Sequence, residues 1–497
     1  MVKIIATKKD DEPKNYQVRT IYVKEGHNLY SYFEEMSRKS KNLYNTTNYH
    51  IRQSYFRLIC KKDHPNTQEV IRSINSILPE INEKRIQKVN KDGNPLKPFS
   101  LLTEQTPFMS ERVLDAVFRK HKNIDFISMP AHVNYLIIKD VFQSWKSYYA
   151  SKKDYKKHPS KYTGKPKPPK YKKNGFLKSF TFSNINCKFK EDGETIRFPK
   201  TKATLKVGKL EGKLKEVGVS YDNGQFQVSI VTELPYVEPK QLNQKRSIGI
   251  DLGVNNFAAI SNNFNEKPII IKGKEIKHIN YLYNKNRAKY YSKIRQGKKH
   301  KEGIFKTKRL NNITLKRNHR IKDYMHKVST AIINYCVKNN TGVIVVGQNK
   351  GWKQGIDIDK KNNQNFTQIP YYKFVQMLEL KAKNEGITLV KQEESYTSKA
   401  SFLDKDIIPV YSKENKEKHK FSGSRKTRGL YISSFGVKLN ADLNGSYNIL
   451  RKHIGDFEAT IGKICNPKIV KNVKDARDFS RGSYSHDIIN TRGNKSV

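Results

Sequence analysis

The N-terminal half of the chain alternates between two hydrophobic periods. Residues 16–24 alternate apolar and polar side chains and then meet a glycine, which predicts a half-buried β-strand. Residues 28–76 place apolar and aromatic side chains at intervals of three and four, which predicts a long amphipathic helix or a helix pair. After a break rich in Pro, Gly and Asn at 92–99, the same spacing returns at 133–150 and predicts one more helix.

A period of two returns beyond this helical stretch. Residues 176–190 and 218–234 alternate apolar and polar side chains, and the second segment contains an Asn-Gly pair that favours a tight hairpin turn. Strands are therefore expected on both sides of the helices. The sequence predicts one β domain, a hairpin-rich barrel or sheet, that is interrupted by a helical insertion.

The C-terminal half predicts strands and helices in alternation. Short apolar runs favour buried strands, and longer stretches with helical spacing favour the helices between them. Pro370 is expected to begin one of these helices and Gly386 to end it. This order is typical of an α/β layer, so the predicted fold class is α/β plus a β-barrel. The expected strands are 246–261, 267–274, 342–347 and 387–394, and the longest helical stretch is 280–337.

Charge narrows the functional classes more than length does. The 497 residues carry 97 Lys and Arg against 46 Asp and Glu, which gives a formal net charge of +51. Self-repulsion on this scale opposes compaction unless a polyanion screens it, so a phosphate backbone is the expected partner. The aromatic content of 11% supplies rings on which unpaired bases could stack. A ribosomal or chromatin-like protein and a membrane-surface binder are the alternatives that charge leaves open.

The segment 146–173 concentrates this character. It holds eleven Lys and five Tyr, with Asp154 as the single acid. Its prolines are expected to prevent a regular helix, so that its donors lie along an extended, exposed track. We interpret the segment as a strap on RNA, and a solvated linker is the alternative. The residues expected to contact nucleic acid are Lys156, Lys157, Lys161, Tyr162, Lys165, Lys167, Lys170 and Tyr171.

Cysteine usage and hydropathy exclude several classes. Cys60, Cys187, Cys336 and Cys465 lie far apart and form no C-x-x-C pair, so neither a zinc ribbon nor a disulfide framework is expected. The N-terminus has no apolar signal region, and no stretch of eighteen apolar residues occurs. We therefore expect an intracellular, cytoplasmic protein that does not span a membrane.

Acids at strand ends are the candidate chemistry. Phosphodiester hydrolysis with two divalent ions requires carboxylates that converge on one point, because Mg²⁺ prefers oxygen ligands. Asp251 follows a buried strand, and Asp442 precedes a helical stretch; a turn cap and a helix cap are the respective alternatives. The strand that ends in Gly347 has no acid there. The next strand ends in Glu393 and Glu394, which alternation sends to opposite faces, so only one of them joins Asp251.

Several motifs, taken in order, carry a resemblance to a known family. GIDLGVNN, VIVVGQNKGWKQ, EESYTSKASFLD and NADLNGSYNI resemble the successive RuvC-type motifs of the TnpB (transposon OrfB) family, which is related to compact type V CRISPR effectors. NLYNTTNYHIRQSYF, MPAHVNYLIIKDVFQSWKSYY and KYTGKPKPPKYK resemble its helical recognition insert and its wedge domain. The resemblance covers about residues 15–455. It implies an RNA-guided DNA endonuclease.

The resemblance also implies a domain layout. An RNase H-like RuvC nuclease domain would follow an N-terminal wedge β-barrel that a helical recognition insert interrupts. Residues beyond the last motif are expected to form a basic mobile tail. The implied boundaries are 1–27 and 131–245 for the wedge, 28–130 for the recognition insert, 246–397 and 440–460 for RuvC, 398–439 for a target-nucleic-acid-binding insert, and 461–497 for the tail.

Two departures from the family pattern bear on activity. Family members usually carry a glutamate where this chain has Gly347, and a subgroup instead has its Glu just before a Tyr-Thr-Ser sequence, which corresponds to Glu394. A nuclease-dead protein that still binds is the alternative, because loss of one ligand cripples two-metal hydrolysis. The insert at 398–439 has no cysteine where many relatives have a zinc ribbon, so zinc is not expected.

Roles follow from the resemblance and from the chemistry of two-metal hydrolysis. Asp251 would bridge two Mg²⁺ ions, with Mn²⁺ as a possible substitute, and Asp442 and Glu394 would each hold one. The implied partners are a guide RNA and target DNA, double- and single-stranded, bound by a monomer or homodimer. A DNA-binding repressor, a conventional transposase and a guide-free nucleic-acid binder are the rival functions. Further expected nucleic-acid contacts are Arg320, His326, Lys353, Arg425, Lys426 and Arg428.

Overall fold

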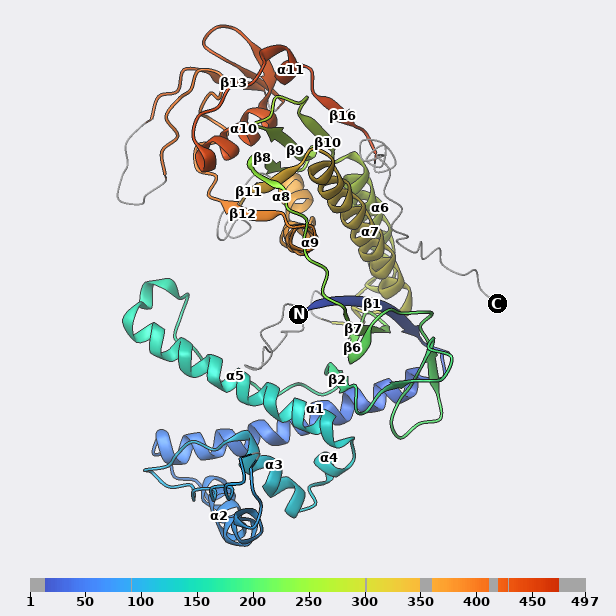
Figure 1. Ribbon diagram of the computed structural model, residues 1–497. Helices are drawn as coiled ribbons and strands as arrows, with labels where there is room; N and C mark the ends of the chain where they lie inside the picture. Colours follow the sequence, from blue (N-terminus) through green and yellow to red (C-terminus); the bar gives the residue numbers. More distant parts are fainter. Residues whose placement is uncertain are drawn as a thin grey trace. The chain divides into compact units, whose positions relative to one another are not determined.

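The chain divides into two compact units, residues 1–237 and residues 238–497 (Figure 1). The computed structural model describes residues 14–90, 92–299, 302–348, 360–410, 419–427 and 429–472. Of the sequence-predicted contacts, Lys353 and Arg428 lie outside the described residues. Within the described ranges, no helix combines the length and the apolar character that crossing a bilayer requires.

Helices form a large part of the first unit. In α1 the apolar side chains recur at the predicted helical spacing, and Phe33, Leu43 and Tyr44 are buried. Helix α5 buries Val133, Ile137 and neighbours in the same core. The helices are α1 (Tyr30–Ser54), the π-helical turn η1 (Tyr55–Ile59), α2 (Pro65–Ile86), α3 (Glu111–Lys120), α4 (Ile124–Ile127), α5 (Ala131–Lys157) and the 3-10 turn η2 (Pro159–Lys161).

Strands from both ends of the first unit share one sheet. β1 pairs with β7 in antiparallel register, so the segments that flank the helices meet in the order β1-β7-β6-β2. Asn223 and Gly224 have positive φ values of 47° and 93°, the backbone of the predicted hairpin turn between β6 and β7. A second sheet has the order β3-β4-β5; the closed barrel stays a prediction. The strands are β1 (Asn15–Lys24), β2 (Phe180–Ser183), β3 (Lys188–Phe189), β4 (Thr195–Arg197), β5 (Thr204–Lys206), β6 (Lys213–Asp222) and β7 (Gln225–Leu234).

The Lys/Tyr segment is only partly extended. The expectation of an extended track from residue 146 was wrong for residues 146–157, which form the last three turns of α5. The helix continues because the first proline of the segment is Pro159, and a proline breaks a helix only at and before its own position. Residues from 162 to 173 contain no helix or strand and match the expected extended track.

The second unit is built on a six-stranded sheet with the order β12-β11-β8-β9-β10-β16. β8, β9 and β10 are consecutive antiparallel neighbours, whereas β11 runs parallel to β8 and β12 runs parallel to β11. Strands lie at all four predicted places, but the single strand expected at 246–261 was wrong, because the chain turns at 253–255, beginning at Gly253, and forms the antiparallel pair β8 and β9. The strands are β8 (Asn243–Leu252), β9 (Asn256–Asn262), β10 (Ile269–Lys272), β11 (Thr341–Gly347), β12 (Thr388–Gln392) and β16 (Lys468–Val470).

Helices cover both faces of this sheet. Alternate residues of β8 and β11, such as Ile250 and Ile344, pack with α7 and α9, whereas Val343 and Val345 pack against α10. The stretch at 280–337 is two helices, α6 and α7, with a break that contains Gly297 and Gly303. The elements are α6 (Lys274–Ile294), α7 (Lys308–Lys338), α8 (Lys360–Thr367), α9 (Tyr371–Asn384), α10 (Ala441–Ile454), α11 (Ile461–Cys465) and a small sheet of β13 (Ser424–Thr427), β14 (Leu430–Ile432) and β15 (Lys438–Asn440).

The C-terminal segment begins as structure rather than as a tail. The expected tail at 461–497 was wrong for its first residues, because α11 lies there and β16 pairs in parallel with β10. Ile464 and Val470 are buried, and this burial of apolar side chains stabilises the segment against the rest of the unit. Residues 473–497 lie outside the described residues.

Candidate functional site

Asp251 projects from the buried strand β8 toward helix α10. Its neighbours Ile250 and Leu252 point to the opposite face, into the core beneath α7 and α9, as strand alternation requires. Gly445 of α10 faces the carboxylate so closely that a Cβ there would lie 2.7 Å from Oδ2 of Asp251. The side chain of Asp251 is partly buried rather than sealed from solvent. Its position on the sheet is therefore set by the strand, and its surroundings are set by α10.

Asp442 stands in the first turn of α10, beside Asp251. The helix cap is Asn440, whose Oδ1 accepts from the backbone N–H of Asp442 at 3.0 Å, so the capping alternative for Asp442 was wrong. Because Asn440 caps the helix, the carboxylate of Asp442 is available to other donors. It accepts from Nδ2 of Asn256 at 2.7 Å and from Nη2 of Arg425 at 3.2 Å. An acid in the first helical turn also interacts favourably with the helix dipole.

Glu394 lies over Gly347, at the end of the strand that lacks an acid. A Cβ on Gly347 would overlap Oε1 of Glu394 and would come within 2.8 Å of its Cγ. The space that a side chain on residue 347 would fill is thus taken by the carboxylate of Glu394. Of the two neighbouring glutamates, Glu394 is the one whose charge acts on Asp251.

Asp251 lies close enough to the other two carboxylates for their charges to act on its ionisation. Burial raises the pKa of Asp251 well above its usual range, and the charges of Glu394 and Asp442 raise it further, while Arg425 opposes them. Burial, and then the charge of Glu393, raises the pKa of Glu394 to about 7. Acids with raised pKa values that cluster on one sheet edge mark a candidate functional site.

Glu393 has a different environment. Its carboxylate accepts from Nζ of Lys452 at 2.5 Å and from the backbone N–H of Ser395 at 2.6 Å. Although burial acts to raise it, the pKa of Glu393 is lowered by these hydrogen bonds with Lys452 and Ser395. We therefore assign Glu393 a structural role, in which it ties the end of β12 to the last turn of α10.

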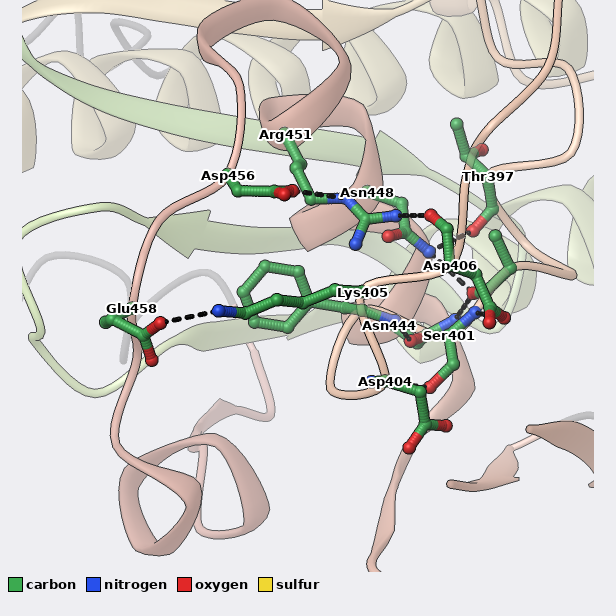
Figure 2. A network of polar contacts seen from close by, with 12 residues as sticks. Thr397, Ser401, Asp404, Lys405, Asp406, Asn444, Asn448, Arg451, Asp456 and Glu458 are labelled. Carbon is green, nitrogen blue, oxygen red and sulfur yellow. Dashed lines mark hydrogen bonds and ion pairs between the residues drawn. The ribbon is translucent and has the colours of Figure 1, made fainter. Parts of the chain in front are cut away.

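A network of amides and charges fixes the segment after Glu394 on the helix after Asp442 (Figure 2). Nδ2 of Asn448 donates to the carbonyls of Thr397 and Ala400 at 2.9 Å and 2.6 Å. Asn444 uses both ends of its amide, donating to the Ala400 carbonyl at 2.7 Å and accepting from the Phe402 N–H at 3.0 Å. Both side chains are buried, and buried amides that are bonded to the backbone of another segment hold that segment in one arrangement. The network therefore fixes the position of Glu394 relative to Asp442.

A second set of polar contacts orients Asp442 from the sheet side. Nζ of Lys272, at the end of β10, donates to Oδ1 of Asn256 at 3.0 Å. Since an ammonium group can only donate, the amide of Asn256 must turn its NH₂ toward Asp442. Sequence reasoning missed both residues. Asn256 is the last residue of the motif GIDLGVNN, and its place in this motif is the signal in the sequence that could have identified it.

The donor set fits a hard divalent ion, although it is not a preformed metal site. Asp251, Glu394 and Asp442 offer only carboxylate oxygens, the ligands that Mg²⁺ prefers, and their mutual repulsion favours a cation between them. As they stand, however, no three His, Cys, Asp or Glu side chains in the described ranges are arranged to hold a metal ion. The guanidinium group of Arg425 is the cation in contact with Asp442.

The extended part of the Lys/Tyr segment is fixed on the helices of the first unit. The Pro169 carbonyl accepts from Nδ2 of Asn48 at 3.1 Å and from Nη1 of Arg52 at 2.9 Å. Asn45 and Lys172 exchange two hydrogen bonds of 2.8 Å and 3.0 Å. Between the segment and α5 lies a groove of about 620 Å³ lined by Tyr162, Lys167, Lys170, Tyr171, Lys172, Tyr44, Tyr148, Ser144, Ser147, Ser151, Pro166 and Pro169.

The other predicted contacts are scattered. In the segment of the first unit, Lys156 and Lys157 end α5, and Lys161 and Lys165 are exposed. In the second unit, Arg320 lines a groove on α7, and Lys426 is exposed on β13. Burial, with the charges of two lysines, lowers the pKa of His326 to about 4, so its imidazole is neutral near pH 7 and carries no charge for a phosphate. Among the predicted nucleic-acid contacts that the structure describes, Arg425 is the one that contacts a carboxylate of the site, that of Asp442.

Comparison with protein families supports the resemblance drawn from the motifs. Residues 225–353 match the OrfB family of probable transposases. Residues 371–449 match the TNB domain of Cas12f1-like proteins. These two matches confirm the likeness to TnpB and to compact type V effectors. No curated protein matches the chain.

Solved structures with similar chains include RNA-guided complexes. A Cas12f1-sgRNA-target DNA complex matches with 14% identity and a TM-score of 0.43, over 87% of this chain and 98% of that chain. A CRISPR-Cas12f ternary complex matches with 14% identity and a TM-score of 0.31, over 86% and 82%. C2c1 of Alicyclobacillus acidoterrestris in complex with single-guide RNA matches with 8% identity and a TM-score of 0.29, over 86% and 70%.

Proposed function

We propose that this chain is an RNA-guided DNA endonuclease that cleaves with Asp251, Glu394 and Asp442. The observation that carries the proposal is that the charges of Glu394 and Asp442 act on Asp251, although the three acids lie far apart in the sequence and meet beside α10. Three acids that share one cationic neighbour, Arg425, still carry excess negative charge that opposes folding, so such a cluster serves chemistry rather than stability. The family matches supply the class of chemistry.

The architecture of the second unit supports an RNase H-like, RuvC-type domain. Three consecutive antiparallel strands, β8 to β10, are extended by the parallel strands β11 and β12 on the side of β8. In this arrangement β8 is central, and an acid at its end stands beside the ends of β11 and β12. We further propose that residues 246–397 and 440–460 form this domain and that 398–439 form a target-nucleic-acid-binding insert.

Divalent ions would be held by Asp251, with Asp442 and Glu394 on either side. When bound, such ions activate water and stabilise the charge on the attacking and leaving oxygens of a phosphodiester. The chain itself contributes the orientation of the ligands. Lys272 fixes the amide of Asn256, and this amide fixes one oxygen of Asp442. Arg425 belongs to β13 of the insert, so its guanidinium group could exchange the carboxylate of Asp442 for a phosphate of the bound strand.

The Lys/Tyr segment supports a role for RNA in the first unit. Its backbone is held by Asn45, Asn48 and Arg52, so on binding only the lysine side chains, and not the chain that carries them, need to be ordered. Tyrosine rings and serine hydroxyls line the same groove, which suits stacking on bases and hydrogen bonding to phosphates. We propose that residues 156–171 bind the guide RNA.

The test is purification of the full chain with its bound RNA, followed by sequencing of that RNA and incubation with a plasmid that carries the matching sequence. We expect RNA of discrete length and double-strand breaks that require Mg²⁺. Cleavage by the wild type but not by Glu394→Gln, with normal cleavage by Glu393→Gln, would support the assignment of Glu394. RNA retention without breaks in any divalent ion would leave the nuclease-dead repressor as the function.

A second candidate is favoured by one specific observation. The matched OrfB family is described as probable transposases, and RNase H-like sites also join DNA ends. A conventional transposase would produce joined DNA products without bound RNA. Treatment of the purified protein with ribonuclease separates the two functions, because it would abolish guided cleavage and would leave strand joining unchanged.

A further inference from the structure

The two antiparallel helices α6 and α7 enclose a second groove that the carboxylate site does not use. Its volume is about 780 Å³. Five of the lining residues are cations, two are tyrosines, and none is an acid. The lining residues include Tyr283, Tyr290, Arg309, Lys316, Arg317 and Arg320.

Contacts within the protein hold cationic side chains of the groove in fixed positions. Arg317 is partly buried and donates from Nε to Oδ1 of Asn280 at 2.9 Å and from Nη2 to the Gln368 carbonyl. The guanidinium carbon of Arg309 lies 4.2 Å from the centre of the Tyr290 ring. These contacts hold one cation in the floor of the groove and another against an aromatic ring, so part of the cost of ordering these side chains on binding is met in advance.

The acids of the helix hairpin itself are too few to balance its cations. Between residues 276 and 322 the sequence has sixteen Lys and Arg and a single acid, Glu302. A solvated helix hairpin normally mixes charges of both signs, because like charges at i and i+4 oppose helix formation. A hairpin with this imbalance is more stable with a polyanion bound along it.

The two tyrosines of the groove indicate whether the bound polyanion is single-stranded or double-stranded. Tyr283 and Tyr290 are seven residues apart on α6, so they lie on one face with about 10 Å between them along the axis. Rings at the side of a groove can stack on bases only where the bases are unpaired, since a duplex turns its base faces inward. The combination of rings and cations therefore favours a single strand over a double helix.

The groove lies toward the edge of the sheet that carries Asp251. The Tyr324 hydroxyl of α7 donates to the Lys272 carbonyl at the end of β10 at 3.3 Å, so α7 residues before 324 extend past that edge. The Gln368 carbonyl that accepts from Arg317 is three residues before Tyr371, whose hydroxyl donates to the Gly253 carbonyl at 2.8 Å. Gly253 is two residues from Asp251.

We propose that the groove between α6 and α7 binds unpaired nucleotides of a single polynucleotide strand, with bases on Tyr283 and Tyr290 and phosphates on Lys316 and Arg320. The strand is target DNA or guide RNA, which share this chemistry. The proposal rests on the proposed function only in that the bound strand would be the one that passes to or from the carboxylates. Binding itself requires neither cleavage nor metal.

The test uses the full chain and two fluorescent ten-nucleotide probes, oligo(dT) and oligo(rU), with a blunt DNA duplex of equal length as comparison. We expect Tyr290→Leu to weaken single-strand binding about tenfold and to leave duplex binding unchanged, because stacking is lost. Tyr290→Phe should restore binding. The matched control is Tyr281→Leu, since Tyr281 is 58% exposed on the same helix and does not line the groove.

Salt dependence tests the phosphate contacts. Lys316→Gln together with Arg320→Gln should lower the slope of log affinity against log salt by about 1.4, at about 0.7 for each single-strand phosphate released. Lys285→Gln, on α6 but outside the groove, should leave the slope unchanged after allowance for the general loss of one charge. A larger effect on oligo(dT) than on oligo(rU) assigns the groove to DNA, and the reverse assigns it to RNA.

Three outcomes would overturn the proposal. Tyr290→Leu could weaken single strands and duplex equally, Tyr290→Phe could fail to restore binding, or Tyr281→Leu could have the same effect as Tyr290→Leu. Failure of the proposed function is measured separately. If Asp251→Asn did not change plasmid cleavage, the carboxylate assignment would fail, whereas the oligonucleotide result would stand.

Discussion

The two faces of the six-stranded sheet differ in a way that separates stability from chemistry. The face beneath α7 and α9 is one continuous apolar cluster, in which Phe374 and Ile332 are fully buried. The face beneath α10 holds only small clusters, such as Val343 and Val345 with Ile449 and Leu450. Between these small clusters stand the carboxylates, glycines and buried hydroxyls such as that of Ser446, which donates to the Gly249 carbonyl at 3.0 Å.

The difference shows how one sheet carries both tasks. Strand alternation gives each face its own set of side chains, so a continuous core on one face stabilises strands whose other face holds groups that oppose folding. Helix α10 packs closely on this face of the sheet because residues 249, 347 and 445 are glycines. A side chain at Gly249 or Gly347 would collide with α10, and one at Gly445 would collide with Asp251. The stability of the sheet and the chemistry of the site should therefore respond to different mutations.

The largest expected effect is on cleavage by Asp251→Asn. Removing the central charge should reduce the cleavage rate about a thousandfold, since a metal site contributes several kcal/mol to the transition state. In the absence of divalent ions the melting temperature should rise, because a carboxylate with a raised pKa is replaced by a neutral amide. A thermal melt in chelator and a plasmid assay in Mg²⁺ measure the two effects. A fall in both would show that Asp251 is structural.

Phe374→Ala should produce the opposite pattern. Phe374 is fully buried beside Phe257, with ring centres 4.9 Å apart, and its truncation should cost about 3–5 kcal/mol of unfolding free energy. Cleavage per folded molecule should be unchanged at a temperature well below the transition. Urea unfolding and a low-temperature cleavage assay test this, and a selective loss of cleavage would mean that the apolar face also shapes the site.

Gly347→Ala should affect the α10 face alone. The new methyl group would displace the carboxylate of Glu394 and press on Ile449, so we expect cleavage to fall about a hundredfold, the order of loss from a displacement of about 1 Å. Gly218→Ala is the control, since a Cβ there has no neighbour closer than 3.9 Å. Equal cleavage by the two variants would contradict the position of Glu394.

The pH dependence of stability is the next smaller effect. Because the folded chain raises the pKa of Glu394 from 4.5 to about 7, it binds this proton more tightly than the unfolded chain does. Stability from this group is therefore full below about pH 4.5 and is lost as the pH rises to about 7, by no more than about 3 kcal/mol. Without divalent ions, Glu394→Gln should remove this decline relative to the wild type, as measured by urea unfolding at each pH. If the unfolding free energies of the two proteins fell in parallel with pH, Glu394 would not be the cause of the decline.

The smallest effect is expected for Glu393→Gln. Lys452 and Ser395 donate to different oxygens of the carboxylate, and the amide of Gln keeps only one oxygen, so one of the two hydrogen bonds and the charge are lost and unfolding free energy should fall by about 1–2 kcal/mol. Cleavage should remain within about threefold of the wild type, which corresponds to less than about 1 kcal/mol of activation free energy. Cleavage kinetics beside Glu394→Gln measure this, and a stronger loss with Glu393→Gln would exchange the roles of the two residues.

Local pattern determined most of the elements because period and turn chemistry act over a few residues. The alternation in β1, the Asn-Gly turn between β6 and β7 and the apolar spacing of α9 were predicted and are present. The errors fell where a local signal was read too broadly. One example is α5, which continues to Lys157, and another is the capping of α10 by Asn440 rather than by Asp442.

The sequence by itself determined which acids end which strands, and alternation determined that Glu393 and Glu394 could not share one environment. Only the tertiary structure decided that Glu394 fills the space above Gly347, that Lys272 orients Asn256, and that two basic helices enclose Tyr283 and Tyr290. The physical reason is range. Periodicity fixes the face on which a side chain lies, whereas the distance between side chains of different elements depends on how the whole core packs.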